Sequence, residues 1–157
     1  MGEYKPFEDL SNAIILAATA HLGQVDKGGE PYILHPLAVM QSVAPDVRAM
    51  IVAVLHDVIE DTSVTAEELM ARFPMRIVEA VLLLSKEPVG VPSRPTYREY
   101  IERLAQNDLA RKVKFADLQH NLLPERLSRL PGGERSIAEK YSRALKILEK
   151  CEEEGCL

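Results

Sequence analysis

An all-α fold is predicted for this 157-residue chain, and three features of its sequence predict it. Apolar residues recur three and four positions apart, the period that places side chains on one face of a helix. No segment alternates between apolar and polar residues for long enough to indicate a β-strand. Proline and glycine stand between the periodic segments, where they end one helix and precede the next. We therefore expect residues 1–157 to form a single compact domain of several helices.

The beginning of the chain is expected to hold two helices separated by a loop. Residues 7–22 carry apolar side chains at a helical period, and Gly23 is a suitable helix end. The following stretch, GQVDKGGEPYI, is polar and rich in glycine, and Pro31 excludes a continuous helix there. Pro36 then fits the first turn of a short helix, where a missing N–H costs no hydrogen bond.

One central helix is predicted over residues 45–62, and its last part reads AVLHDVIEDT. Four ionisable side chains lie in that part: His56, Asp57, Glu60 and Asp61. On a helix these positions fall within about 140° of one another, so the four side chains would share one face. Ordinary i, i+4 pairs on a solvated face are the alternative. The many branched aliphatic neighbours favour a buried helix, and buried carboxylates without a counter-charge are costly, which favours a bound cation.

The remainder of the chain is expected to contain further helices. The capping box TAEE begins a helix at Thr65, and Pro74 follows the end of that helix. Asp108 is expected to cap the helix that continues to Asn121. The predicted helices of this part span residues 66–73, 77–84, 97–104, 108–121 and 137–153, with a loop or crossover over residues 86–95.

Composition excludes several classes of function. The net charge of −5 argues against general nucleic-acid binding, although a small phosphorylated substrate needs only local positive charge. The two cysteines, Cys151 and Cys156, match no zinc motif, and so few cysteines indicate a reducing compartment. No apolar run is long enough to span a membrane, and MGEYKPFED is not a signal peptide. We therefore expect a cytoplasmic protein that binds neither nucleic acid nor membrane.

The segment KFADLQHN carries a further candidate ligand. Lys114, Asp117 and Asn121 are spaced i, i+3 and i+7, so they share one helix face. Asp117 then has two open interpretations: a surface ion pair with Lys114, or a carboxylate directed into the protein. Among the four histidines, His35 opens a helix and His56 begins the carboxylate face. Neutral imidazole with carboxylates suits Mn²⁺, Fe²⁺ or Zn²⁺, and oxygen ligands shift the preference toward Mn²⁺.

Four motifs together carry a family resemblance: AATAHLGQ (17–24), GEPYILHPLAV (29–39), LHDVIEDT (55–62) and VKFADLQHN (113–121). In order and approximate spacing they resemble the HD-domain superfamily of metal-dependent phosphohydrolases. More narrowly, the chain is similar to the small alarmone hydrolases, which remove the 3′-diphosphate from (p)ppGpp. The HD pair alone is a weak motif, but HDxxEDT with PYIxHP upstream is specific. The resemblance implies an HD-type domain and an enzyme that hydrolyses a small phosphorylated nucleotide.

The resemblance also implies roles for particular residues. One divalent ion, usually Mn²⁺ in this family, would be held by four side chains: His35, His56, Asp57 and Asp117. Glu60 and Asp61 match the acidic pair that handles the attacking water. Lys27 matches a basic residue that contacts phosphate or nucleotide, and Asn121 matches one that lines the nucleotide pocket. A metal ion lowers the pKa of bound water from 15.7 toward about 7, which agrees with hydrolysis near neutrality.

Departures from the family pattern leave the substrate open. Asp26 stands where the bifunctional alarmone enzymes commonly carry Arg, and an acid there is expected to repel phosphate. Leu123 and Pro124 replace polar residues that are often found in those enzymes. A phosphohydrolase that acts on another nucleotide or phosphorylated metabolite is therefore an alternative. A non-catalytic nucleotide-binding module is a third hypothesis, against which the intact pair of Glu60 and Asp61 counts.

Several other polar residues have two interpretations each. His21 is expected to pack in the core or against a loop, since it lies between apolar neighbours. His120 would lie at the rim of the pocket or face solvent, and Tyr32 would stack near the substrate or fill the core. Arg126 and Arg129 would supply local positive potential or belong to a solvated face, and the solvated face is the preferred interpretation.

Overall fold

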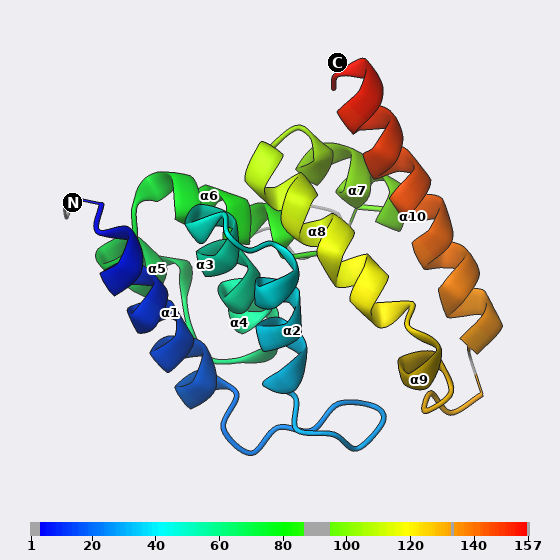
Figure 1. Ribbon diagram of the computed structural model, residues 1–157, viewed down its shortest axis with the longest axis horizontal. Coiled ribbons are helices and arrows are strands. Elements are labelled where there is room, and N and C mark those ends of the chain that lie inside the picture. The colour runs from blue at the N-terminus through cyan, green and yellow to red at the C-terminus, as the bar shows by residue number, and fades with distance from the viewer. Residues whose placement is uncertain (1–3, 87–94, 133, 157) are drawn as a thin grey trace.

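The computed structural model describes residues 4–86, 95–132 and 134–156 (Figure 1). Its regular elements are α-helices, and an isolated antiparallel bridge joins Val25 to Pro31. The all-α prediction is therefore confirmed. The helices are α1 (Pro6–Ala20), α2 (Leu34–Ser42), α3 (Val47–Leu55), α4 (Val58–Asp61), α5 (Ala66–Arg72), α6 (Met75–Leu84), α7 (Tyr97–Ala105), α8 (Asp108–Asn121), α9 (Pro124–Leu127) and α10 (Glu134–Glu154).

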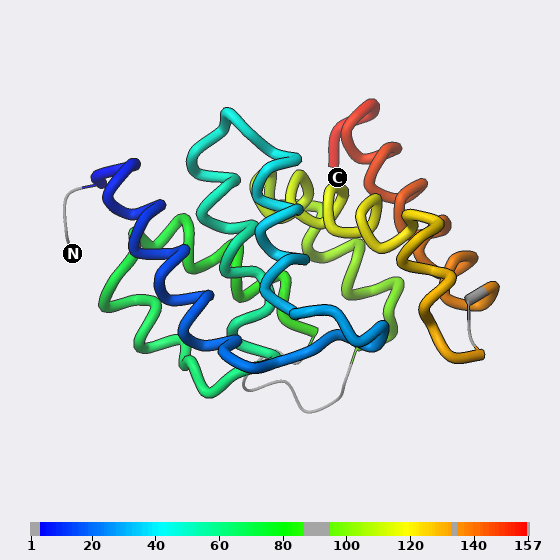
Figure 2. The backbone as a smooth tube through the Cα atoms, turned by 60° about the horizontal axis from the view of Figure 1, so that its bottom comes forward, coloured from blue at the N-terminus to red at the C-terminus, as the bar shows by residue number. Residues whose placement is uncertain are grey.

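Helix α3 lies at the centre of the molecule and packs against α1, α2, α6 and α8 (Figure 1). Its sequence, VRAMIVAVL, is apolar on nearly every face, as expected for a helix that neighbours surround. Ala49 and residues 51–55 are fully buried. Helix α10 packs on the outer side of α7 and α8, at the other end of the molecule from α1 (Figure 2). The contacts of α3 with α2 and α8 bring the histidine-bearing segments beside the aspartate-bearing helix.

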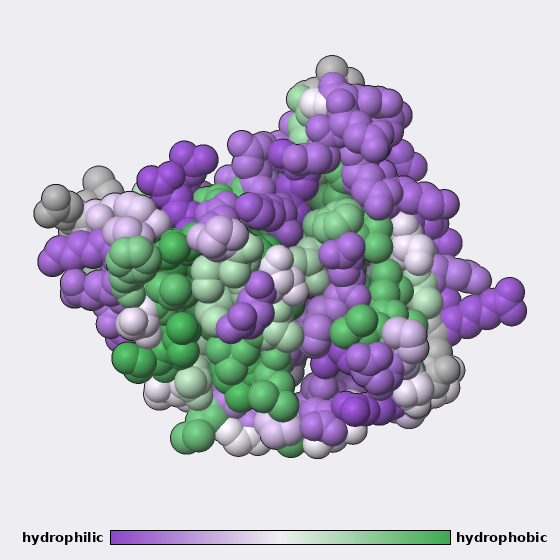
Figure 3. All heavy atoms as spheres, viewed as in Figure 1, coloured by the Kyte–Doolittle hydropathy of each residue, from purple (hydrophilic) through white to green (hydrophobic). Residues whose placement is uncertain are grey.

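Helix α1 approaches α3 closely because small side chains face it. Ala13 and Ala17 are fully buried at this contact. Larger apolar side chains of α1 and α2 point outward instead, among them Phe7, Ile15 and Leu34. Figure 3 shows the resulting apolar surface over α1 and α2, whereas the surface of α10 is mainly polar. Leu10, Ile14 and Leu16 of α1 are partly buried and also pack against the core.

The predicted continuous helix over residues 45–62 is wrong, because the chain divides there into α3 and α4. His56 and Asp57 form the junction. The carbonyl oxygen of Ala53 accepts hydrogen bonds from both the backbone N–H and the ring Nδ1 of His56, at 3.4 and 2.6 Å. That carbonyl would accept from the N–H of Asp57 in a continuous helix, so the imidazole competes with the helical bond. Asp46 caps the first turn of α3 through the N–H of Ala49.

Other predicted boundaries agree with the structure more closely. The capping box at Thr65 is present and begins α5, and a second one at Thr96, which was not predicted, begins α7. Asn107 caps α8 by accepting from the N–H of Ala110, so the prediction that Asp108 is the cap is wrong by one residue. The short α9 was not predicted. Most of the loop predicted over residues 86–95 lies outside the described residues.

Two further features concern the cysteines and the apolar character of the helices. Cys151, near the end of α10, forms a disulfide with Cys156 in the following tail, with their Cα atoms 4.8 Å apart. The reducing compartment that the low cysteine count indicated stays a prediction. Among the described residues, no helix has the length and apolar character that crossing a bilayer requires.

Candidate active site

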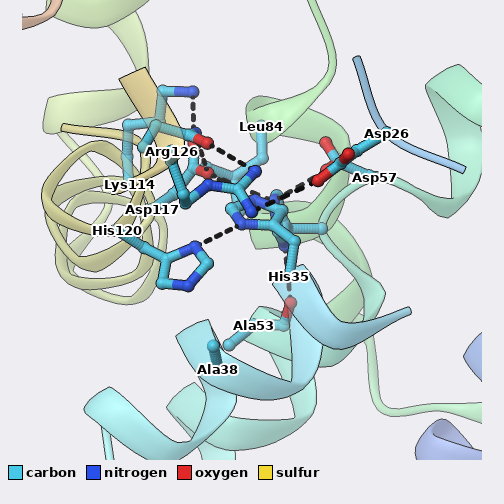
Figure 4. Close-up of polar contacts among 12 residues, drawn as sticks. Asp26, His35, Ala38, Ala53, Asp57, Leu84, Lys114, Asp117, His120 and Arg126 are labelled. Carbon is cyan, nitrogen blue, oxygen red and sulfur yellow. Dashed lines mark hydrogen bonds and ion pairs between the residues drawn. The ribbon is translucent and has the colours of Figure 1, made fainter. Parts of the chain in front are cut away.

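Three side chains from separate helices meet in the interior beside a cavity. His35 comes from the first turn of α2 and Asp117 from α8 (Figure 4). His56 comes from the end of α3. All three are buried, and each offers one ligand atom within 4.8 Å of the others. The Oδ1 atom of Asp117 lies 2.9 Å from Nε2 of His35 and 3.6 Å from Nε2 of His56. Two imidazole nitrogens and a carboxylate oxygen at this spacing form a candidate metal centre.

The ring of His56 is held in one orientation by its own helix. Its Nδ1 donates a hydrogen bond to the carbonyl oxygen of Ala53, at 2.6 Å. Because that nitrogen carries the hydrogen, the Nε2 atom of the neutral ring has the lone pair. This Nε2 faces Asp57 and Asp117, as a metal ligand must. The bond that interrupts the central helix therefore also directs His56 at the candidate centre.

Asp57 lies at the edge of this cluster. Its Oδ2 atom is 2.9 Å from Nε2 of His56 and also accepts a hydrogen bond from the hydroxyl of Tyr32. Burial alone would raise the pKa of Asp57, but the charge and hydrogen bond of His56 hold that pKa well below its usual value. Three of the four predicted ligands thus share one cluster, and Asp57 joins it through His56.

Asp117 has a second, cationic neighbour inside the protein. Lys114 places its Nζ atom 2.8 Å from Oδ2 of Asp117, and both side chains are buried. Burial would raise the pKa of Asp117, but Lys114 and the hydrogen bonds from His35 and His56 hold it well below its usual value. Of the two interpretations of Asp117, the inward-directed carboxylate is therefore confirmed. Asn121 also donates to Oδ1 of Asp117, at 2.9 Å.

The surrounding carboxylates favour positive charge at the Nε2 atom of His56. Burial lowers the pKa of this imidazole, but Asp57 and Asp117 more than compensate and hold the pKa well above its usual value. A proton or a metal cation can supply the favoured charge. Since a metal ligand must be the neutral ring, metal binding at this position displaces a proton.

A cavity of about 660 Å³ opens beside the cluster. It is lined by residues that the sequence placed in the site, among them Lys27, His35, Asp57, Glu60, Asp61 and Asn121. Glu60 accepts a hydrogen bond from the backbone N–H of Lys86, which fixes its carboxylate at the wall. Asp61 is more exposed, and burial together with the charge of Asp57 raises its pKa. The structure therefore brings every predicted site residue to this cavity or to the cluster behind it.

Sequence reasoning left Tyr32 and His120 undecided, and both belong to the site. The Tyr32 hydroxyl contacts Asp57, and it lies 3.4 Å from the Oδ2 atom of Asp61. The Nδ1 atom of His120 lies 2.8 Å from Nδ1 of His35, and burial, with His35 and Arg126, lowers the pKa of His120 to about 4. Its position three residues after Asp117 on one helix was the available signal.

Asp26 and Arg126 form an unexpected pair in the cavity wall. Asp26 was expected to repel phosphate, but its Oδ2 atom lies 3.4 Å from the Arg126 guanidinium. Its Oδ1 atom accepts from the N–H groups of Gly28 and Glu30. Arg126 was assigned to a solvated face, and this prediction is wrong because Arg126 lines the cavity and donates to Asn121 at 3.3 Å. The charge of Asp26 is therefore largely compensated.

Elsewhere in the core, His21 is buried as expected. Its Nδ1 atom lies 2.8 Å from the side-chain oxygen of Gln24, whose amide donates to the backbone carbonyl of Asp61. The His21 ring also packs against Tyr32, with ring centroids 4.8 Å apart. These contacts join the end of α1 to the wall of the cavity.

Comparison with known proteins places this chain in a family. Residues 13–105 match the family described as HD domain, so the chain belongs to the HD domain family. The matched region contains His35, His56 and Asp57, and Asp117 follows it on α8. A solved structure described as a metazoan ortholog of SpoT that hydrolyzes ppGpp superposes with a TM-score of 0.63. It covers 99% of this chain and 100% of that one at 22% identity, so it shows a shared fold.

The chain is also similar to parts of several larger bacterial proteins. A guanosine-3′,5′-bis(diphosphate) 3′-pyrophosphohydrolase of Vibrio cholerae is 44% identical over 115 residues, which cover 71% of this chain and 15% of that protein. A bifunctional (p)ppGpp synthase/hydrolase of Escherichia coli is 35% identical over 122 residues, 72% of this chain and 17% of that protein. A GTP pyrophosphokinase of Myxococcus xanthus is 34% identical over 137 residues, 78% and 18% respectively. This chain therefore spans less than a fifth of each relative.

Proposed function

We propose that this chain is a metal-dependent phosphohydrolase that removes the 3′-diphosphate from (p)ppGpp. The observation that carries the proposal is the buried cluster of His35, His56 and Asp117 at the wall of a cavity that also holds Glu60 and Asp61. The relatives from Vibrio cholerae and Escherichia coli, whose names include this hydrolytic activity, support the choice of substrate. The net reaction would convert ppGpp and water to GDP and pyrophosphate.

One divalent cation, Mn²⁺ in this proposal, would be held by His35, His56, Asp57 and Asp117. The donors fit such an ion, because the carboxylates favour positive charge at the cluster and the neutral ring of His56 would direct a lone pair into it. When bound, the cation supplies an acidified water near neutral pH and offsets charge that develops on phosphoryl oxygens. Lys114 keeps Asp117 ionised for this role.

The acidic pair on α4 would manage the water and its proton. Glu60 is oriented by the N–H of Lys86, so its carboxylate is positioned before substrate arrives. Asp61, whose pKa is raised by burial and by Asp57, can more readily hold a proton. Lys27 would contact a phosphate group from the loop that precedes α2, and Asn121 would contact the nucleotide while it orients Asp117.

A second candidate substrate class is favoured by one observation. Asp26 and Arg126 form an ion pair in the cavity wall. Leu123, three residues before Arg126 in the sequence, has a partly exposed apolar side chain. A wall of this composition differs from the family pattern, which favours a hydrolase of another nucleotide or phosphorylated metabolite. The cytoplasmic location stays part of the proposal.

A nucleotide panel with Mn²⁺ tests the proposed function. We expect release of pyrophosphate, and not of single phosphate, from ppGpp, because the cleaved bond joins the 3′-oxygen to the diphosphate. Phosphate and pyrophosphate are measured separately, with and without a chelator. Hydrolysis of another nucleotide with no response to ppGpp would favour the second substrate class. Binding of ppGpp and Mn²⁺ without hydrolysis of any nucleotide would favour a non-catalytic binding module.

Arg126 gives a prediction about substrate affinity. Its guanidinium has two long contacts, 3.3 Å to Asn121 and 3.4 Å to Asp26, and its Nε has no hydrogen-bond partner among the described residues. A substrate phosphate could engage these donors in a charge-assisted bond worth about 1.5–3 kcal/mol. We therefore expect Arg126→Gln to raise KM for ppGpp about 10- to 100-fold with little change in kcat.

Arg129→Gln is the matched control for this prediction. Arg129 also lines the cavity, but its side chain is about half exposed and pairs with Glu30 at 3.3 Å. Its loss removes the same charge from a solvated position, where an ion pair contributes little. Equal rises in KM for the two variants would show that Arg126 acts only through general positive potential.

A further inference from the structure

The ring of His35 has a polar neighbour at each nitrogen. Its Nε2 lies 2.9 Å from Oδ1 of Asp117, inside the candidate metal cluster. Its Nδ1 lies 2.8 Å from Nδ1 of His120, a residue one turn further along α8 than Asp117 (Figure 4). The two ring centroids are 4.9 Å apart. His120 therefore contacts His35 on the side of the ring that faces away from the cluster.

A histidine that binds a metal through one nitrogen keeps its hydrogen on the other, and a neighbouring acceptor fixes that arrangement. His56 has the carbonyl of Ala53 as this acceptor. His35 has His120 in the corresponding place. An imidazole is an unusual choice for the position, because either of its nitrogens can donate or accept, whereas a carbonyl oxygen only accepts.

One hydrogen lies between the two Nδ1 atoms. The ring to which this hydrogen is covalently bound determines whether Nε2 of His35 has a lone pair for a metal. If His120 donates, the hydrogen of neutral His35 is on Nε2, which then donates to Asp117 and has no lone pair for a metal. If His35 donates, its Nε2 presents a lone pair to the cluster, and His120 carries its own hydrogen on Nε2. The first arrangement blocks metal binding and the second permits it.

We propose that His120 is a positioning residue for the metal centre: it accepts the Nδ1 hydrogen of His35 and so directs the lone pair of His35 Nε2 at the metal. The inference rests on the proposed metal site and adds a residue that does not itself contact the ion. His120 is not part of the group of atoms that meet at the cluster, since its ring lies behind His35. His120 would thus act on the metal centre through His35, without contacting the substrate or the metal.

The test compares two replacements of His120 by Mn²⁺ affinity, measured by titration calorimetry without nucleotide. His120→Phe fills similar space but offers no acceptor, and we expect it to weaken Mn²⁺ binding about 10- to 100-fold. His120→Gln restores a side-chain carbonyl that can accept from His35, and we expect it to recover most of the affinity. Gln119→Ala is the control, because Gln119 is the exposed neighbour on the same helix.

A second measurement reads the hydrogen directly. In protein loaded with diamagnetic Zn²⁺, ¹⁵N shifts of the His35 ring should place the hydrogen on Nδ1 in the parent. Unchanged Mn²⁺ affinity in His120→Phe would overturn the inference, as would a His120→Gln variant as weak as His120→Phe with the same thermal stability. If the parent protein binds no Mn²⁺, the proposed metal site is wrong and the inference about His120 is wrong with it. If the parent binds Mn²⁺ and the His120 variants do not behave as expected, only the inference about His120 is wrong.

Discussion

Replacing Asp117 by asparagine is expected to abolish Mn²⁺ binding at micromolar metal and to lower ppGpp hydrolysis about a thousandfold or more. The Oδ1 atom of Asp117 is the carboxylate oxygen that lies between the Nε2 atoms of His35 and His56. An amide oxygen there is neutral, so the centre loses charge as well as a strong ligand. The metal stabilises the transition state by several kcal/mol. Losing this stabilisation accounts for the expected fall in rate, since each 1.36 kcal/mol of activation free energy changes the rate tenfold. Calorimetric titration and initial rates check both parts.

The same change should also destabilise the protein, and this effect can be separated. Lys114 is buried against Asp117 and would lose its partner. An unpaired buried charge costs about 3–5 kcal/mol of unfolding free energy. The double variant Lys114→Met with Asp117→Asn removes both charges, so it should recover much of the stability and none of the Mn²⁺ binding. Parental Mn²⁺ affinity in either variant would exclude Asp117 as a ligand.

The helices were predictable because their signals are local. Capping residues such as Thr65 and breaks such as Pro74 act within one turn of the chain. The division of the central helix was missed, because it depends on which way the imidazole of His56 turns. The periodic pattern of apolar residues is the same in a continuous and in an interrupted helix. The extent of the single domain, residues 1–157, stays a prediction, since the family match covers residues 13–105.

The site was predictable from motif resemblance more than from spacing. The helical spacing predicted that His56 and Asp57 lie on one face with Glu60 and Asp61. It could not predict that His35 and Asp117 lie close to His56, because this depends on how α2, α3 and α8 pack together. Spacing also left the direction of Asp117 open, because the burial of one helix face is decided by its neighbours. The pairing of Asp26 with a residue on α9 joins positions that are 100 residues apart, and no local pattern indicates such contacts.

Glu60→Gln is expected to leave Mn²⁺ affinity near the parental value and to lower kcat for ppGpp about 10²- to 10⁴-fold, the usual contribution of a general acid or base. Glu60 is not one of the four proposed metal ligands, and the replacement leaves the cluster of His35, His56 and Asp117 unchanged. Glutamine keeps a side-chain oxygen for the N–H of Lys86, so the wall of the cavity should keep its shape. What the variant lacks is the negative oxygen that would accept a proton from the attacking water.

The measurement is single-turnover hydrolysis at saturating Mn²⁺, with metal affinity determined on the same preparations. Glu67→Gln is the control, because it makes the same chemical change on an exposed position of α5. Parental turnover in Glu60→Gln would remove Glu60 from the proposed mechanism. In that case Asp61, whose raised pKa suits it for holding a proton, would be the remaining carboxylate on α4 to test. A loss of Mn²⁺ affinity equal to that of Asp117→Asn would instead make Glu60 a ligand, and the division of the acidic residues between metal and water would be wrong.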